Sequence, residues 1–203
     1  GPHERLERGS VPSGNADPYG LRRQSNGILR ILLEAGWDLS LKELLQFALD
    51  QISSGANGSQ ARQKISSDIL LFMTDRFQLL MQDLGFELDE IYSVTKNSRD
   101  SDLGALRVVL LRAKIEALHE VRAHPDFDAV AGAYKRAGNI LRQARQKGMN
   151  ASHSQFDISL LKDPAEKTLH SVMDDLSRKA KTLVEGKQYK AALQNWVQVR
   201  RDL

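Results

Sequence analysis

The chain has 203 residues, of which 41% are hydrophobic and 27% are charged. That length is sufficient for one or two domains with a hydrophobic core. The absence of cysteine excludes disulfides, thiolate metal sites and cysteine nucleophiles, and it suits a cytoplasmic location. The formal net charge of +3 permits contact with nucleic acid but does not by itself argue for it.

Residues 1–16 mix Pro, Gly, Ser, Asn and charged residues without periodicity, which is typical of a flexible lead. Gly1 and Pro2 are the kind of pair that protease removal of a tag leaves behind. No apolar run approaches the roughly 20 residues that a membrane-spanning helix needs. No membrane partner is therefore expected.

The segment from Asp17 to Gly36 predicts a first helix. Asp17 can cap the first turn, Pro18 fits the first helical position, and Gly36 is expected to end the helix. Helical spacing predicts a buried face made of Leu21, Ile28, Leu29, Ile31, Leu32 and Leu33.

A capping box, Ser40 with Glu43 three residues later, predicts the start of a second helix that runs to about Ile52. Leu39 and Leu44 are placed as a hydrophobic staple across that start. The two helices together predict a helical hairpin over residues 17–52.

Residues 53–60 have the composition of a linker, with Gly55 and Gly58 among small polar residues. The sequence therefore predicts a domain boundary there. The hairpin over residues 17–52 is expected to precede it, and a helical bundle over residues 61–203 is expected to follow it.

Apolar residues at helical spacing predict three helices between residues 61 and 122. The first ends at Gly85 and is expected to bury Ile65, Ile69, Phe72, Met73, Phe77, Leu80, Met81 and Leu84. A short helix follows near residues 88–94, and then a polar break over residues 97–101. Asp102 is expected to cap the third helix, which buries Leu103, Leu106, Val109, Leu110, Ala113 and Leu118.

The stretch from Asp126 to Gly148 predicts a helix with two different faces. At about 100° per residue, one face carries Phe127, Val130, Tyr134, Ala137, Ile140, Leu141 and Ala144, and it is expected to be buried. The opposite face carries Lys135, Asn139 and Arg142. A single acid within the helix, Asp128, accompanies five basic residues: Lys135, Arg136, Arg142, Arg145 and Lys147. Such a basic face can be a binding surface or can simply be solvated.

The remainder predicts a loop over residues 149–162 and then two helices. Phe156, Ile158 and Leu161 are expected to tuck back from the loop onto the core. Asp163 and Glu166 predict a capping box for a helix to about residue 185. The last helix is expected to bury Tyr189, Ala192, Leu193, Trp196 and Val197.

The sequence shows no catalytic or metal-binding motif. Its five histidines fall at no ligand spacing, and no glycine-rich phosphate loop or nucleophile elbow is present. No segment alternates with the period of a strand, so the predicted fold class is all-α. The chain is therefore expected to be non-catalytic and to hold no cofactor of its own.

Four blocks, in their order and spacing, resemble bacterial glycyl-tRNA synthetase β subunits in their C-terminal region. They are residues 17–24 with 27–31, residues 133–141 with a Lys-Arg-x-x-Asn-Ile-Leu pattern, residues 160–166 with a Leu-x-x-Pro-x-Glu pattern, and residues 186–193. The resemblance covers roughly Val11 to Leu203.

The resemblance implies a helical hairpin from the end of an upstream helical domain, followed by an anticodon-binding helical bundle. That upstream domain is related to His-Asp phosphohydrolases, but residues 17–52 contain no histidine, which disfavours a metal-dependent phosphohydrolase. The implied partners are tRNA-Gly, the catalytic α subunit and the rest of the β subunit. ATP and Mg belong, by the same resemblance, to the catalytic subunit of glycine–tRNA ligase.

The resemblance and the helical-face argument coincide at Lys135, Arg136, Asn139 and Arg142, which are the predicted tRNA-binding residues. Lys and Arg hold phosphates, and polar side chains read unstacked loop bases. Arg136 can equally form a structural pair. Arg76 matches a further family position, and an ion pair with a neighbouring helix is its alternative role.

A second interpretation is a non-catalytic helical protein–protein interaction module, in which the basic face is only solvated. The resemblance expects a further apolar and acidic segment and a final helix after Leu203. The predicted bundle is thus expected to be truncated at its C-terminus, with apolar surface left exposed or covered by another molecule.

Overall fold

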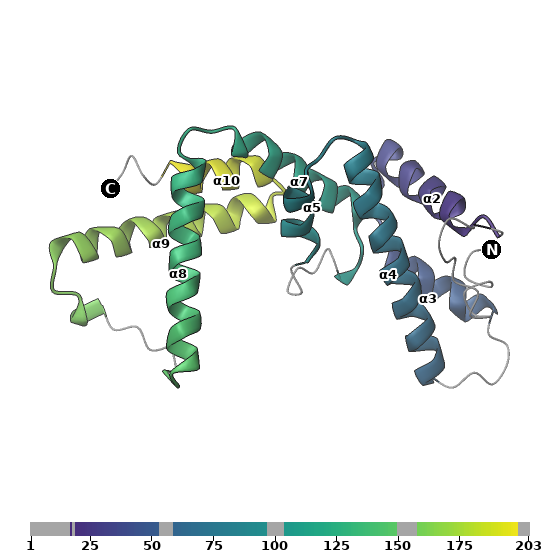
Figure 1. Cartoon of the computed structure of the whole chain (residues 1–203), viewed down its shortest axis with the longest axis horizontal. Coiled ribbons are helices and arrows are strands. Elements are labelled where there is room, and N and C mark those ends of the chain that lie inside the picture. Colours follow the sequence, from purple (N-terminus) through teal and green to yellow (C-terminus); the bar gives the residue numbers. More distant parts are fainter. Residues whose placement is uncertain (1–16, 18, 53–58, 97–103, 150–157, 199–203) are drawn as a thin grey trace. The chain divides into compact units, whose positions relative to one another are not determined.

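The computed structural model describes residues 17, 19–52, 59–96, 104–149 and 158–198 (Figure 1). Its elements in chain order are α2 (Leu21–Ala35), α3 (Leu41–Ile52), α4 (Ser59–Asp83), α5 (Leu88–Thr95), α7 (Val108–Arg122), α8 (Phe127–Gln146), the 3-10 helix η2 (Ile158–Leu160), α9 (Pro164–Glu185) and α10 (Tyr189–Val197). No strand occurs within these ranges, and the predicted all-α fold class is confirmed.

The chain divides into two compact units, Gly1–Ile115 and Glu116–Leu203, with the division inside α7. Unit 1 contains α2 and α3, and both pack against α4. The division between the two compact units lies within α7, whereas the sequence analysis predicts a domain boundary over residues 53–60. The assignment of residues 17–52 to the end of an upstream domain stays a prediction.

Helix α4 supplies the centre of the unit 1 core. Phe77 and Met81 are fully buried, and the core is completed by residues from α2, α3, α5 and α7, together with Leu106. The expected burial is confirmed for Ile69, Met73, Phe77, Leu80 and Met81. It is wrong for Leu84, which follows the last residue of α4 and is exposed.

Helix α2 begins at Leu21, later than predicted, after Gly20 in the left-handed region (φ +68°). The carboxylate of Asp17 still serves the first turn, because its Oδ2 accepts a hydrogen bond from the Arg22 amide at 3.2 Å. The capping role predicted for Asp17 is therefore retained across a longer entry. Pro18 lies outside the described residues.

The buried stripe of α2 is narrower than predicted. Leu21, Leu29 and Leu32 are buried, whereas Ile28 and Ile31 are exposed. The fourth buried residue is the small polar Ser25, so the stripe follows one line along the helix and leaves its flanks in solvent. The predicted helix end is confirmed, since Gly36 adopts φ +66° as C-cap.

The start of α3 is fixed by long-range polar contacts. Ser40 Oγ accepts a hydrogen bond from the Glu43 amide at 3.2 Å and donates one to the Ala105 carbonyl at 3.3 Å. The predicted cap residue is thus confirmed, but the staple is wrong because Leu39 and Leu44 are both exposed. Contact with the residue 105 segment takes the place of a staple in holding the entry to this helix.

An ion pair joins the same two segments in unit 1. Arg107 donates from Nε to Asp38 Oδ1 at 2.8 Å and from Nη2 to Asp38 Oδ2 at 2.6 Å, a bidentate geometry. Helix α7 starts at Val108 rather than at the predicted residue 102, which lies outside the described residues. The buried Leu106 has φ +48°, a conformation that is not helical and precedes the helix start.

Unit 2 contains a hairpin made of α9 and α10. The predicted capping box is confirmed: Asp163 Oδ1 accepts from the Ala165 amide at 2.8 Å, and Glu166 accepts from the Asp163 amide at 3.3 Å. The hairpin buries Leu176, Ala180, Ala192 and Val197. Ile158 is exposed, against the prediction, and Phe156 lies outside the described residues.

Helix α8 also belongs to unit 2, and its predicted burial is wrong. The helix forms where it was predicted, but none of its residues is buried. Tyr134 is 83% exposed, Ile140 66% and Leu141 45%. The amphipathic pattern marked a face that can be buried, but within unit 2 this face is at most half-buried.

Candidate nucleic-acid interface

The local sequence explains why α8 is a helix at all. Its 20 residues are rich in Ala, Arg and Gln, which have high helix propensity. It starts after Asp126, whose amide donates to His124 Nδ1 at 3.2 Å, and the chain leaves the helix at Gly148 with φ +76°. These termini place the helix where the sequence predicts it.

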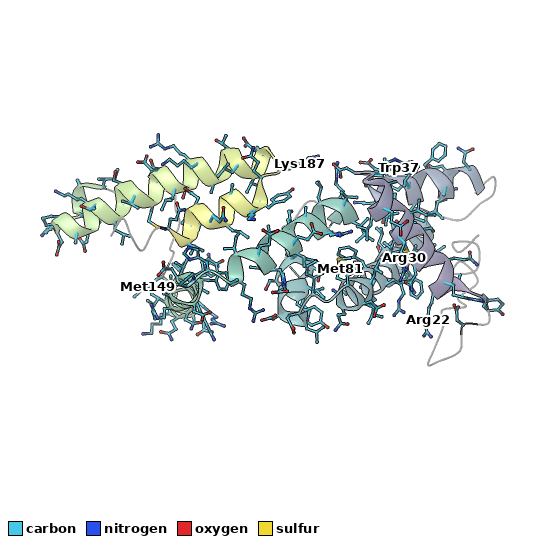
Figure 2. All side chains as sticks on the ribbon, turned by 90° about the horizontal axis from the view of Figure 1, so that it is seen from above. Arg22, Arg30, Trp37, Met81, Met149 and Lys187 are labelled. Atoms are coloured by element: carbon cyan, nitrogen blue, oxygen red, sulfur yellow. The ribbon has the colours of Figure 1, made fainter. Side chains whose placement is uncertain are left out.

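Within unit 2, α8 contacts α10. Figure 1 shows α10 beside the N-terminal half of α8, while the C-terminal half extends beyond α9 and α10. Figure 2 looks nearly along the axis of α8, next to Met149, and its side chains radiate on all sides. The C-terminal half of α8 is thus largely accessible to solvent within this unit.

The cations of α8 lie on distinct sides of the helix. Lys135 and Arg142, seven residues apart, stack on the side that we call the basic face, together with Asn139. Arg136 and Arg145 lie to either side of that face at about 100° per residue. All four cations are exposed, so the surface can meet a polyanion without displacing protein contacts.

The structure brings Arg142 and Asn139 into direct contact. Arg142 donates a hydrogen bond from Nη2 to Asn139 Oδ1, one turn away on the basic face. The contact orients the guanidinium and leaves the Asn139 amide NH₂ group to donate elsewhere. A cationic guanidinium and an uncharged amide therefore lie side by side on the basic face.

An open depression of about 560 Å³ lies over the helix at Gly138, lined also by Leu141, Arg142, Arg145 and Gln146. A side chain at Gly138 would meet nothing within 4 Å, so this position leaves the floor of the depression open. Sequence reasoning counted Arg145 as a cation but did not assign it to the site. The signal that could have found it is the spacing of Arg142 and Arg145, four and seven residues after Gly138, which places all three on one side of the helix.

Arg76 lies on α4 in unit 1, whereas the other predicted tRNA-binding residues lie on α8 in unit 2. Its guanidinium carbon stands 5.6 Å from the ring centroid of Phe72, a cation–π arrangement. Its buried Nε has no hydrogen-bond partner among the described residues. Arg76 is partly buried against the helix, and its predicted role in binding tRNA stays a prediction.

The part of the chain that the structure describes shows no metal site and no membrane-spanning helix. No group of three or more His, Asp or Glu side chains there could hold a metal ion. Among the same residues, no helix combines the length and the apolarity needed to span a membrane. The basic helix α8 remains the strongest candidate site.

The described residues form an all-helical fold that carries an exposed basic helix. Comparison with known proteins identifies a family for this chain. Residues 5–96 match the sequence model of a family described as glycyl-tRNA synthetase beta subunit.

Three curated relatives agree, and each is called glycine–tRNA ligase beta subunit. The protein from Acidobacterium capsulatum is 35% identical over 196 residues, which is 95% of this chain and 26% of the relative. The relative from Desulforapulum autotrophicum is 34% identical over 188 residues, 90% of this chain and 25% of its own. The relative from Geobacter sp. strain M21 is 35% identical over 185 residues, 91% of this chain and 25% of its own.

The chain belongs to the glycyl-tRNA synthetase β-subunit family. It spans about a quarter of the length of the curated relatives that it matches. An alignment over 95% of the chain includes α8, although the family model ends before that helix.

Proposed function

We propose that this chain provides tRNA binding to a glycyl-tRNA synthetase, by recognising the anticodon region of tRNA-Gly through α8. The observation that carries the proposal is that α8 has no buried residue and displays Lys135, Arg136, Arg142 and Arg145 in solvent. Family membership supports tRNA-Gly as the RNA of this proposal, and the exposed cations support α8 as the surface that binds it.

The chemistry of an anticodon loop suits this surface. Its bases are unstacked, and proteins read such bases through their edges and through stacking, while cations hold the phosphates. Lys135 and Arg142 are placed to hold phosphates along the basic face. Asn139 beside them offers an uncharged donor for a base edge.

We assign catalysis to a separate subunit of the enzyme rather than to this chain. A separate α subunit would use ATP and Mg to attach glycine to tRNA-Gly, and this chain together with the rest of a β subunit would present the tRNA. The chain itself is proposed to be non-catalytic and to act in the cytoplasm.

The salt dependence of tRNA-Gly binding tests the proposal. Each phosphate contact on a largely single-stranded loop contributes a slope of about −0.7 in log K against log salt. Three or four contacts on α8 therefore predict a slope of about −2 to −3. A flat response would contradict the role of the basic face and favour the interaction module without RNA affinity.

A charge-reversal variant tests whether the salt dependence of tRNA-Gly binding comes from the basic face. Lys135→Glu with Arg142→Glu should abolish most of the slope, because both side chains lie on the basic face and are exposed. Lys181→Glu with Lys187→Glu changes the net charge equally at exposed positions away from α8 and serves as the matched control. An equal loss in both variants would show a general charge effect rather than a site.

A further inference from the structure

The depression at Gly138 lies in the C-terminal half of α8, at the border between the two faces of that helix. Its wall at Leu141 belongs to the apolar side of α8, and its wall at Arg142 belongs to the basic face. Arg145 and Gln146 line it nearer the end of the helix. Within unit 2 this half of α8 extends beyond α9 and α10 (Figure 1). The depression therefore joins an apolar surface to a cationic one and is open to solvent within the unit.

Packing within the described residues does not explain why a glycine stands at position 138. A glycine inside a helix makes the helix less stable than alanine does. Outside the neighbouring turns of its own helix backbone, a Cβ at Gly138 would meet no atom within 4 Å, so no described side chain needs the space. Glycine is favoured where a ligand approaches the backbone closely. The missing side chain thus leaves room for a ligand.

The hydrogen bond between Arg142 and Asn139 helps to keep this room free. Arg142 donates from Nη2 to Asn139 Oδ1. At about 100° per residue, Asn139 lies on the side of Arg142 that faces away from Leu141 and Gly138. The guanidinium of Arg142 is therefore turned toward the basic face rather than across Gly138. Its charge remains next to the depression without filling it.

The residues around the depression favour a ligand with an apolar face and a neighbouring negative charge. An inorganic phosphate would not use Leu141, and an aliphatic side chain would not use the two arginines. A nucleotide has both parts, because its base has two flat apolar faces and its phosphate carries the charge. Guanidinium groups stack on unstacked bases as well as holding phosphates, and the Gln146 side chain offers a donor and an acceptor to a base edge.

We propose that the depression at Gly138 is a nucleobase subsite, which holds one unstacked base of the bound tRNA over the glycine. The base lies against Leu141 and under the Arg145 guanidinium, its edge faces Gln146, and Arg142 holds the adjoining phosphate. This inference rests on the proposed function, and it names the part of the RNA that the border of the basic face takes up. Asn139, on the other side of Arg142, stays available to a second base.

Filling the depression tests the proposal on the full chain. Gly138→Leu should weaken tRNA-Gly binding at least about tenfold, a difference of about 1.4 kcal/mol, because the new side chain takes the place of the base. Gly132→Leu is the matched control on another side of α8, where a Cβ meets only Arg136 Nη1, at 3.6 Å, and it should keep the affinity. Unchanged affinity in Gly138→Leu, or an equal loss in both variants, overturns the proposal.

The apolar wall gives a second, independent pair of variants. Leu141→Ser should weaken tRNA-Gly binding about as much as Gly138→Leu does, because the base loses its apolar contact. Ile140→Ser changes a neighbouring exposed aliphatic residue that does not line the depression, and it should alter the affinity less than about twofold. Circular dichroism checks that the helix content of both variants is retained. Equal losses in the two serine variants overturn the proposal.

Removing bases from the RNA identifies the occupant. The base of tRNA-Gly is removed at one anticodon-loop position at a time, which leaves every phosphate in place. At one position the removal should weaken binding to the unchanged chain at least about tenfold and should not weaken Gly138→Leu further, because both changes remove the same contact. Additive losses at every position overturn the subsite but leave the proposed function standing. Failure of the unchanged chain to bind tRNA-Gly overturns both.

Discussion

Helices α4 and α8 both carry apolar residues at helical spacing, but those of α4 are largely buried and none of those of α8 is. Helix α4 packs against α2, α3 and α5, and Phe77 in its C-terminal third is fully buried. Helix α8 contacts α10 and buries no residue. An amphipathic pattern therefore predicts a helix and the side that can be buried, whereas burial itself depends on which other elements reach that side.

The largest expected effect is on the core of unit 1. Phe77→Ala should lower the free energy of unfolding by about 3–5 kcal/mol, because it removes a fully buried ring and leaves a cavity. Tyr134→Ala is the matched aromatic truncation on α8, and it should change that free energy by less than about 0.5 kcal/mol. Urea unfolding of both variants measures the contrast. Equal costs would show that α8 is packed in solution.

The second-largest expected effect is on the ion pair between Arg107 and Asp38 in unit 1. Arg107→Ala should lower the free energy of unfolding by about 1.5–3 kcal/mol, because Asp38 loses a bidentate charged partner. Arg178→Ala removes an exposed pair with Asp174 and should cost less than about 1 kcal/mol. Thermal unfolding at two salt concentrations separates the two, since only the exposed pair is strongly screened.

The cap of α9 gives a smaller effect in unit 2. Asp163→Ala should cost about 1 kcal/mol, because the Ala165 amide loses its acceptor. Asp163→Asn keeps an oxygen acceptor at the N-cap and should cost much less. Hydrogen exchange at the first turn of α9 is the measurement. Equal exchange in both variants would mean that the carboxylate charge, rather than the cap, stabilises the turn.

The parts of the fold that sequence predicts well are those fixed by local chemistry. The capping box at Asp163, the glycine stop at Gly36 and the α4 core residues all follow from neighbours within a few positions. The predictions that fail depend on distant segments. The staple at Leu39 is replaced by contacts with residue 105, and α7 starts late because Leu106 leaves the helical conformation.

At the candidate site, too, the sequence predicts which residues share a helix face but not the contacts that depend on the three-dimensional structure. Spacing on a helix places Lys135, Asn139 and Arg142 on one face before any coordinates are known. It cannot show that Asn139 accepts a hydrogen bond from Arg142, which depends on side-chain conformation. Nor can it show that the apolar side is exposed, which depends on what packs against it.

The smallest effect concerns the division of labour on the basic face. Arg142→Ala should flatten the salt slope of tRNA binding by about 0.7, one phosphate contact. Asn139→Ala should reduce discrimination between anticodons and leave the slope unchanged. Because the two side chains are hydrogen-bonded, the double variant should lose less affinity than the sum of the single variants. Strict additivity would show that the contact does not form in solution.

The central claim is that α8 binds the anticodon region of tRNA-Gly, and comparing two tRNAs tests it most directly. The affinity of the chain is measured for tRNA carrying a glycine anticodon and for the same tRNA body carrying another anticodon, at one salt concentration. The account predicts tighter binding to the glycine anticodon, with the difference lost in Asn139→Ala. Equal affinity for the two tRNAs, or a difference that survives Asn139→Ala, would contradict it.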